Sequence, residues 1–384
     1  MTTQFSAPTS VSLGDPAPWF SAQSLTGNEL HLHVNAGRWV VLSFFHDLSS
    51  PRASEEFRAL VTTIANFSDD KLVAYAVLTK PLGNVAADAA ALAAMSLPNL
   101  RMVADFDGSI TRLYGAQAMP RTVVLDPMLR AVAIIDWDNP AGHATMLSQI
   151  LPSLPAIDDA AGVPMSAPAL IIPRVLDFDL CDFLVQLYDK MGGEDSGFLL
   201  DSDGKTATVV DHRLKRRRDM LIVVPELRER IRSQLVRRLI PAIERYFQFN
   251  ATRMDRYLVS CYDSGEGGHF YRHRDNLNAG AEHRRFAVSI NLNRDYDGCD
   301  LIFPEFGRRI YRAPVGGAVV FSCGALHEVT PITRGRRYAF LPFLYNEADA
   351  EKRLANNTRL AAGSARYTTG DDLLYPETPA VAAE

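Results

Sequence analysis

Cysteine is scarce in this sequence and lies only in the second half of the chain. The 384 residues contain four cysteines, Cys181, Cys261, Cys299 and Cys323, and no two of them form a CxxC pair. This spacing argues against a disulfide framework and a cysteine-based zinc site, and it favours a reducing compartment. We therefore expect a cytoplasmic protein.

Long hydrophobic runs and a targeting segment are lacking as well. The N-terminal residues MTTQFSAPTSVSLGD have no basic start followed by an apolar run, so we expect no signal peptide. The apolar runs over 39–45 and 73–78 have the length of strands, whereas a membrane span needs about 20 apolar residues. A formal net charge of −5 leaves no basic surplus. We expect neither a membrane nor a nucleic-acid partner.

The composition that remains is that of an ordinary globular protein. Hydrophobic residues make up 47% of the chain and charged residues 22%, which argues against a disordered or collagen-like chain. The length predicts two domains of about 150–200 residues each.

The first half of the chain alternates strand-like and helix-like segments. Continuous apolar runs predict buried strands, and the spacing of Phe57, Leu60 and Ile64 after Pro51 predicts one face of a helix. The predicted strands are 39–45, 72–78, 121–125 and 131–137, and further helices are predicted over 85–95 and 141–151. Strands that alternate with helices indicate an α/β layer with parallel crossovers.

A segment without apolar periodicity, 152–168, is predicted to be a linker. A strand over 170–172 and a helix over 179–191 are expected to follow it. A long amphipathic helix begins at Pro225, and Pro241 is expected to kink or divide it. Its buried face is predicted to consist of Leu227, Ile231, Leu235, Leu239 and Ile243.

From Met254 onward the apolar period changes to two, which is typical of strands. Glycine and proline separate the strand candidates, which are 254–261, 269–273, 285–293, 300–303, 309–312, 318–322 and 338–345. Many short strands with such turns predict an all-β sandwich or barrel. The polar, acidic residues after Tyr345 are expected to be peripheral or disordered.

Candidate metal ligands lie in this β-rich part. His273 and Asp275 are two residues apart, so a strand would point both side chains the same way. His327 follows the apolar run AVVFS, and two histidines with one carboxylate form the facial triad that suits non-haem Fe(II). Arg337, further on, carries a fork of donors that can clamp a carboxylate.

Other polar residues nearby are open to more ordinary interpretations. Tyr271 either lines the pocket or packs as a plain aromatic, His269 and His283 are expected at the surface, and Asn291 and Asn293 share a strand face that could reach substrate. The basic run HRLKRRRD, 212–219, is interpreted as a solvated turn rather than a patch for an anionic partner, given the acidic overall charge.

Together these residues resemble the iron- and 2-oxoglutarate-dependent dioxygenases, specifically the prolyl 4-hydroxylase-like branch. The resemblance covers roughly 168–345. It rests on Tyr262, Gly267, Phe270, His273 and Asp275, on YDGCDLIFP, and on GGAVVFSCGALHEVTPITRGRRYAF with His327 and Arg337. The stretch IIPRVLDFDLCDFLVQLY is similar to the family's helical lead-in. Cys299 stands where the family often has a second glycine, which is not a ligand position.

The resemblance implies a double-stranded β-helix (jelly-roll) with supporting helices, and it implies a role for each residue. His273, Asp275 and His327 would bind Fe(II), and Arg337 with Tyr262 would hold the far carboxylate of 2-oxoglutarate. The implied reaction uses O2 to hydroxylate a prolyl residue or another amino-acid-like substrate, peptidyl or small, with release of succinate and CO2. Ascorbate is left open as a further cofactor.

The first half of the chain resembles the peroxiredoxin branch of the thioredoxin-like fold over roughly 13–151. LGDPAPWFSAQSLTG is similar to that family's opening, and WVVLSFFHDLSSPRASEEF to its active-site strand and helix. The position of the family's peroxidatic cysteine falls near Ala53, and no cysteine precedes Cys181. Since the chemistry needs a thiolate, peroxidase activity of this domain is excluded. Pro120 stands where thioredoxin folds commonly carry a cis-proline.

The expected organisation is therefore α/β plus mainly β. A flexible N-terminus (1–12), a thioredoxin-like α/β/α domain (13–151), a linker (152–168), an oxygenase domain (169–346) and a tail (347–384) follow one another. The first domain is expected to be a non-catalytic docking or dimerisation module, so a homodimer is left open. The alternative is a non-enzymatic interaction protein built from two relic domains.

Overall fold

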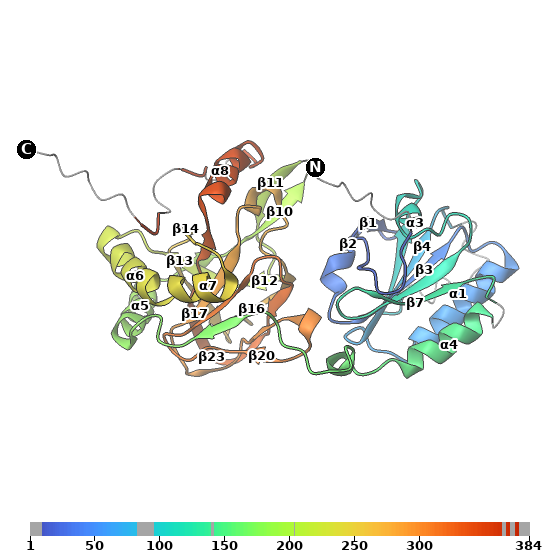
Figure 1. Cartoon of the computed structure of the whole chain (residues 1–384), viewed down its shortest axis with the longest axis horizontal. Coiled ribbons are helices and arrows are strands. Elements are labelled where there is room, and N and C mark those ends of the chain that lie inside the picture. The colour runs from blue at the N-terminus through green and yellow to red at the C-terminus, as the bar shows by residue number, and fades with distance from the viewer. Residues whose placement is uncertain are drawn as a thin grey trace, which may run out of the picture. The chain divides into compact units, whose positions relative to one another are not determined.

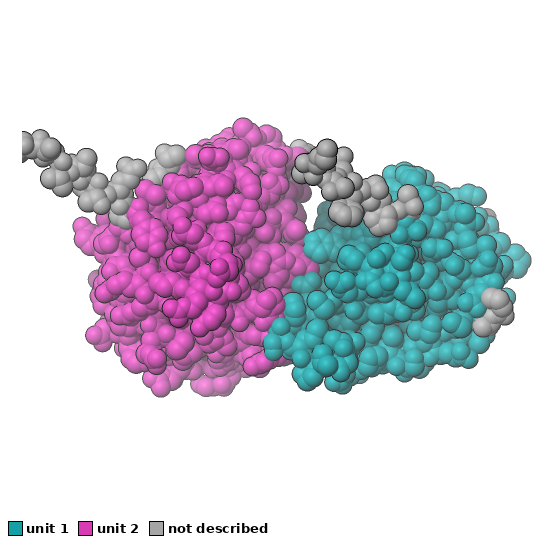
Figure 2. Space-filling view, in the orientation of Figure 1, with its two compact units in different colours: residues 1–166, 304–308 teal, residues 167–303, 309–384 magenta. Residues whose placement is uncertain are grey.

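The chain divides into two compact units (Figure 2), which are described one at a time. Unit 1 comprises Met1–Ser166 with Pro304–Arg308, and unit 2 comprises Ala167–Phe303 with Arg309–Glu384. The computed structural model describes residues 10–82, 96–139, 142–202, 204–362, 366–368 and 373–375. The helix predicted over 85–95 lies outside these residues. Among them, every helix is too short or too polar to cross a bilayer.

Unit 1 is built on one mixed sheet in the order β2-β1-β5-β4-β3-β6-β7. Its strands are β1 (Ser21–Ser24), β2 (Glu29–His31), β3 (Trp39–Phe45), β4 (Leu72–Leu78), β5 (Leu100–Ala104), β6 (Arg121–Leu125) and β7 (Ala131–Asp136). The parallel pairing that the sequence predicts holds for β3 with β4 and for β4 with β5, whereas β6, β7, β1 and β2 run antiparallel to their neighbours.

Two helices of unit 1, α1 (Pro51–Ile64) and α4 (His143–Ser153), lie side by side against the sheet (Figure 1). Phe57, Leu60 and Ile64 of α1 share one hydrophobic core with Leu147 and Leu151 of α4, as the helical spacing predicts. The remaining helical elements of this unit are short: η1 (Leu32–Asn35), α3 (Ser109–Leu113) and η3 (Ile157–Asp159). The apolar strands β3 and β4 are buried along their whole length because both faces of the sheet are covered.

Unit 2 contains two large antiparallel sheets. The first has the order β12-β16-β22-β19-β20, and the second follows β14-β24-β17-β23-β15-β13-β9, with β21 joining β17 to β8. Their strands are β8 (Leu170–Ile172), β9 (Glu194–Asp195), β12 (Lys215–Arg216), β13 (Arg218–Leu221), β14 (Arg253–Asp255), β15 (Leu258–Asp263), β16 (His269–His273), β17 (Phe286–Asn291), β18 (Tyr296–Gly298), β19 (Leu301–Ile302), β20 (Ile310–Tyr311), β21 (Ala318–Ser322), β22 (His327–Val329), β23 (Ile332–Phe340) and β24 (Phe343–Tyr345). Of the two predicted arrangements, the described strands form paired sheets rather than a closed barrel.

Two of the predicted strands are each broken in two. The strand expected over 254–261 is interrupted because Arg256 has a φ of 69°, in the left-handed region. The strand expected over 338–345 is interrupted at Pro342, which has no backbone N–H to donate to a ladder. A separate hairpin, β10 (Phe198–Ser202) with β11 (Lys205–Val209), was not predicted.

The helices of unit 2 cover its larger sheet. They are α5 (Phe178–Met191), α6 (Pro225–Arg238) and α7 (Ile240–Phe247). The division near Pro241 is confirmed, and Pro241 sits in the first turn of α7, where a missing N–H costs nothing. All five predicted apolar positions, from Leu227 to Ile243, are buried in the core of this unit.

Of the two alternatives predicted for the tail, disorder is wrong for its described part, whereas a peripheral position fits α8 (Glu347–Ala355), in which Asp349 is the one buried residue. After Tyr345 the chain forms α8 and η6 (Asn356–Thr358), and the side chains of Leu360 and Leu374 are buried. The Nε of Arg285 donates to the buried carboxylate of Asp349 at 2.8 Å and so fastens α8. Composition alone missed this segment because a partner far away in the sequence holds it.

Candidate metal centre

The three predicted metal ligands lie together at the ends of two neighbouring inner strands, β16 and β22, of the five-stranded sheet of unit 2. His273 ends β16 and His327 begins β22, and the two residues are direct partners in the antiparallel ladder. Asp275 follows β16, where its backbone N–H donates to the carbonyl of Cys323 at 2.9 Å. One candidate ligand atom from each of the three residues lies within 4.8 Å of the others.

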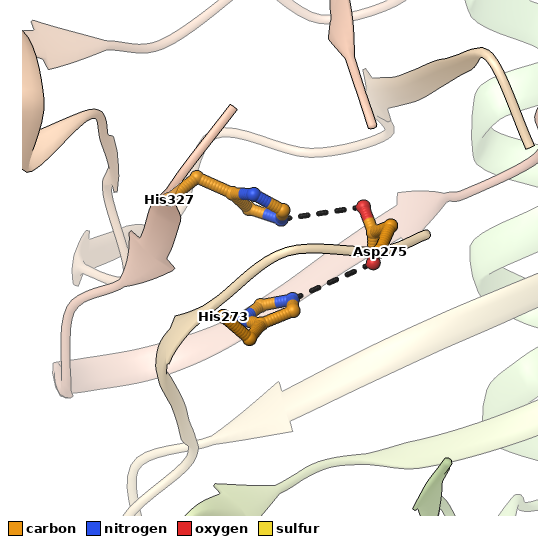
Figure 3. A group of neighbouring side chains, drawn as sticks. All are labelled: His273, Asp275 and His327. Atoms are coloured by element: carbon orange, nitrogen blue, oxygen red, sulfur yellow. Dashed lines mark ion pairs between the residues drawn. The ribbon is translucent and has the colours of Figure 1, made fainter. Parts of the chain in front are cut away.

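The side chains point toward one another (Figure 3). The Nε2 of His273 is 3.6 Å from one carboxylate oxygen of Asp275, and the Nε2 of His327 is 3.4 Å from the other. Each histidine uses its other ring nitrogen for a backbone carbonyl, Nδ1–H of His273 to Tyr271 at 2.7 Å and Nδ1–H of His327 to Ala325 at 3.0 Å. A carbonyl only accepts, so Nδ1 of each ring carries a proton, and Nε2 of each ring faces Asp275.

The pKa values of His327 and Asp275 are shifted in the directions that favour a bound cation. Burial and the neighbouring His273 lower the pKa of His327 to about 4, so its imidazole is neutral at neutral pH. Burial alone would raise the pKa of Asp275, but His327 and His273 outweigh it and hold this pKa below its ordinary value. The neutral imidazole of His327, the ring of His273 and one carboxylate therefore converge on one point.

Arg337 and Tyr262, the predicted co-substrate residues, line the same cavity of about 70 Å³ as the three ligands. Both are buried, on β23 and β15 respectively, and the guanidinium carbon of Arg337 lies 5.8 Å from the Tyr262 ring centre. Arg337 donates from Nη2 to the hydroxyl of Ser289 at 2.8 Å and from Nη1 to the carbonyl of Cys299 at 3.3 Å. Its Nε has no hydrogen-bond partner among the described residues.

The basic run 212–219 is not the solvated turn that its composition predicts. β12 pairs with β16, and the side chains of Lys215 and Arg217 are buried and line the cavity. Arg217 pairs with Asp219 at 2.7 Å and donates to the Tyr262 hydroxyl at 3.5 Å. The signal that could have found these residues is their period of two, since Lys215, Arg217 and Asp219 alternate with exposed positions.

The remaining candidates do not join the site. Tyr271 is 47% exposed and lies outside the cavity lining. The expected surface position of His269 and His283 is wrong, because both are buried and His283 pairs with Asp255 at 3.3 Å. Asn291 accepts from the Tyr296 hydroxyl and donates to the Asn293 carbonyl, which makes it a structural residue.

In unit 1 the position expected for a peroxidatic cysteine is filled by Ala53, which is buried in the first turn of α1. The hydroxyl of Ser50 caps this turn by accepting from the backbone N–H of Ala53. The peptide bond before Pro120 is trans, since the described residues contain no cis bond. The thioredoxin-like fold is therefore kept around this position, but the side chain there is not a thiol.

Family models match both halves of the chain. The AhpC/TSA family matches residues 13–136, and the 2OG-Fe(II) oxygenase superfamily matches residues 257–345. These matches confirm both resemblances that the sequence showed, and with them the thioredoxin-like and jelly-roll fold classes.

Solved structures resemble each part separately. A prolyl-4-hydroxylase from Pseudomonas putida is 19% identical, with 50% of this chain and 96% of that chain covered and a TM-score of 0.36. The thioredoxin domain of a thiol-disulfide oxidoreductase from Bacteroides vulgatus is 23% identical, with 33% and 89% covered and a TM-score of 0.28.

Curated relatives match the second half. The chain spans about half the length of two PKHD-type hydroxylases from Synechococcus strains, each 30% identical over 112 residues, or 26% of this chain and 49% of the relative. A PKHD-type hydroxylase from Hyphomonas neptunium is 31% identical over 179 residues, which are 43% of this chain and 77% of that protein. On this similarity, the chain belongs to the family of PKHD-type hydroxylases.

Proposed function

We propose that the chain is an Fe(II)- and 2-oxoglutarate-dependent dioxygenase that hydroxylates its substrate. One observation carries the proposal. Two histidine side chains and a carboxylate place their ligand atoms within 4.8 Å of one another in a cavity that also contains a buried arginine with an unused donor. If these side chains formed hydrogen bonds only with one another, none of their ring nitrogens or N–H groups would be left without a partner.

The donor set fits Fe(II). His273, Asp275 and His327 form a two-histidine, one-carboxylate face that leaves further coordination positions open. The Nδ1 hydrogen bonds to Tyr271 and Ala325 fix both imidazoles in the tautomer that presents Nε2. When bound, Fe(II) with 2-oxoglutarate and O2 supplies the oxidising chemistry, and 2-oxoglutarate leaves as succinate and CO2.

Arg337 fits the far carboxylate of 2-oxoglutarate. Ser289 and the Cys299 carbonyl hold its two Nη atoms, so the guanidinium is oriented before any ligand arrives. The Tyr262 hydroxyl adds a donor beside it, and the apolar side chains of Phe321 and Leu301 in the cavity wall exclude water.

The substrate is proposed to be a prolyl residue in a peptide or another amino-acid-like compound. Unit 1 is proposed to serve as a non-catalytic module for docking or dimerisation, because its core is complete while its thiol position is filled by Ala53. A cytoplasmic location, use of ascorbate and the domain boundaries at 151, 168 and 346 are parts of the same proposal.

The test uses the full chain under anaerobic conditions. Addition of Fe(II) and 2-oxoglutarate is expected to give a weak visible charge-transfer band, and admission of O2 is expected to give succinate. The same chain with Zn(II) in place of Fe(II) serves as the control, because it fills the site without redox chemistry. Neither band nor succinate with Fe(II) would contradict the proposal and favour an interaction protein built from relic domains.

A further inference from the structure

A second, larger cavity of about 350 Å³ lies next to the candidate metal centre. It shares a wall with the first cavity, since Lys215, Arg256, Phe270, His273 and Asp275 line both. Any molecule in the second cavity therefore lies beside the metal ligands, which is the place a substrate must occupy to be hydroxylated.

The lining of this cavity is strongly unbalanced in charge. Among the described residues, four basic side chains line it and one carboxylate does, that of Asp275; the basic residues are Lys215, Arg256, Arg274 and Arg284. A metal bound to Asp275 would use that carboxylate and add further positive charge. Such a surplus in a cavity attracts an anion, because low-dielectric walls focus the field of the charges.

Two of the arginines lie near the same aromatic ring, and the charge of one acts on the other. The guanidinium carbons of Arg256 and Arg284 lie 4.9 and 4.1 Å from the centre of the same ring, that of Phe343. Burial, followed by the charges of Arg284 and Arg217, lowers the pKa of Arg256 to about 10. The Nε of Arg284 is buried and lacks a hydrogen-bond partner among the described residues.

Two carboxylates outside the lining, Asp219 and Asp255, act on these cations, and each has other partners as well. Asp219 lies 2.7 Å from Arg217 and 3.7 Å from Arg256, and it accepts from the hydroxyl of Ser260 at 2.6 Å. Asp219 therefore serves two guanidinium groups, and Asp255 is shared between His283, at 3.3 Å, and the charges of Arg284 and Arg256. The cavity lining itself keeps more basic side chains than carboxylates.

The hydrogen-bond partners of the Lys215 ammonium group are neutral. Its ammonium group donates to the Ser196 hydroxyl at 2.7 Å and to the Gly197 carbonyl at 2.5 Å, and it lies 4.9 Å from the Phe270 ring centre. Burial and the charge of Arg217 lower its pKa well below the ordinary lysine value. Asp219 and Asp275 oppose this lowering through their charge, but the described residues form no direct ion pair with Lys215, and an anion in the cavity would add one.

We propose that this cavity binds an anionic group of the substrate, a carboxylate or a phosphate-type oxyanion, and that Arg256 and Lys215 select for it. The inference rests on the proposed function, because it identifies the cavity as the substrate side of the metal centre. Arg337 stays reserved for 2-oxoglutarate, so the substrate anion and the co-substrate have separate cationic sites.

The test measures anion binding to the full chain loaded anaerobically with Fe(II) and saturating 2-oxoglutarate. Isothermal titration calorimetry measures the affinity for acetyl-Glu-Pro-Glu-amide and for its neutral counterpart acetyl-Gln-Pro-Gln-amide. A third probe, benzene-1,3-disulfonate, is a small, weakly chelating dianion. At least one anionic probe is expected to bind tenfold more tightly than the neutral peptide. Tight binding of the acidic peptide indicates an acidic segment as substrate, and tight binding of the disulfonate alone indicates a small acid.

Matched variants locate the binding. Arg256→Gln and Lys215→Met are each expected to weaken the anionic probe at least fivefold, whereas Arg334→Gln, at an exposed arginine paired with Asp297, is expected to leave it unchanged. Arg284→Gln replaces Arg256→Gln if thermal unfolding shows that the latter does not fold. Equal affinity for anionic and neutral probes, or anion binding that no cavity variant weakens, overturns the inference. The charge-transfer band of the same samples reports separately on the proposed function.

Discussion

Each unit of this protein contains a cluster of buried polar side chains around a histidine, and the two clusters differ in whether they are closed. In unit 1, His143 contacts Glu56 at 2.5 Å through Nδ1 and the Thr122 hydroxyl at 2.8 Å through Nε2, and Thr122 meets Ser43 at 2.7 Å. Both ring nitrogens of His143 are thereby used, and the ring is fully buried. A buried polar network whose members are all hydrogen-bonded makes the fold more rigid.

In unit 2 the corresponding histidines are left open. His273 and His327 each use one ring nitrogen for a backbone carbonyl and turn the other toward Asp275. Arg337, in the same cavity, keeps one donor unused. The comparison teaches that convergent polar atoms left over by the fold mark a binding site, while an equally buried set that satisfies itself marks structure.

The largest expected effect comes from removing a ligand from the open cluster. Asp275→Ala or His327→Ala is expected to lower Fe(II)-dependent succinate formation by about a thousandfold or more, because the oxidising chemistry requires the bound metal. Succinate formation and Fe(II) binding are measured together. His46→Ala, at an exposed histidine of unit 1, is the matched control and is expected to change neither. Undiminished turnover in the ligand variants would rule out this cluster as the metal site.

The next largest effect concerns the unused donor. Arg337→Gln is expected to raise the KM for 2-oxoglutarate about a hundredfold, which corresponds to about 2.7 kcal/mol, because a charged, bidentate clamp is lost. Fe(II) binding should persist, since Arg337 is not a ligand. Arg334→Gln on the same strand removes a charge of the same sign from an exposed position and should leave the KM unchanged. If the KM is unaltered in Arg337→Gln, another cation holds the co-substrate.

Breaking the closed cluster is expected to change stability rather than activity. Glu56→Ala leaves the buried Nδ1 of His143 without a partner, at a cost of about 2–3 kcal/mol in the free energy of unfolding. The three tryptophans, Trp19, Trp39 and Trp137, all lie in unit 1, so the fluorescence of denaturant unfolding reports on that unit. Glu55→Ala, at the exposed neighbouring glutamate, should have little effect.

Activity provides the second half of that experiment. At temperatures where Glu56→Ala is folded, succinate formation per molecule is expected to equal that of the unchanged chain. A fall in succinate formation with intact fluorescence would show that the closed cluster of unit 1 takes part in the reaction, and the comparison between the units would fail.

The sequence predicted the open cluster well because its signals are local or typical of a family. His273 and Asp275 are two residues apart, and the apolar run before His327 predicted the strand that leads to it. The strands β3 and β4 and the division of the long helix near Pro241 were predicted for similar reasons, since apolar runs and proline act over a few residues.

Long-range pairing accounts for most of what the sequence missed. A basic run looks solvated by composition, and only the pairing of β12 with β16 buries Lys215 and Arg217. Likewise, α8 is fastened by Asp349 to Arg285 on a distant part of the chain. No period or local charge pattern encodes such partners, so the second cavity and its cations came from the structure.

The smallest expected effect concerns thiol chemistry, which the comparison predicts in neither unit. Unit 1 has no cysteine, and the four thiols of unit 2 are buried. Burial raises the pKa of Cys181 and of Cys261 to about 12, and it also raises the pKa of Cys299 and of Cys323, so almost no thiolate exists at neutral pH.

The native chain should therefore consume peroxide no faster than an equal concentration of free cysteine, and it should react slowly with a thiol reagent such as DTNB. In denaturant all four thiols should react at once, which controls for oxidation during preparation. Saturable, rapid peroxide consumption by the native chain would mean that at least one of these thiols becomes accessible to solvent. Unit 2 would then carry out the thiol chemistry that unit 1 has lost.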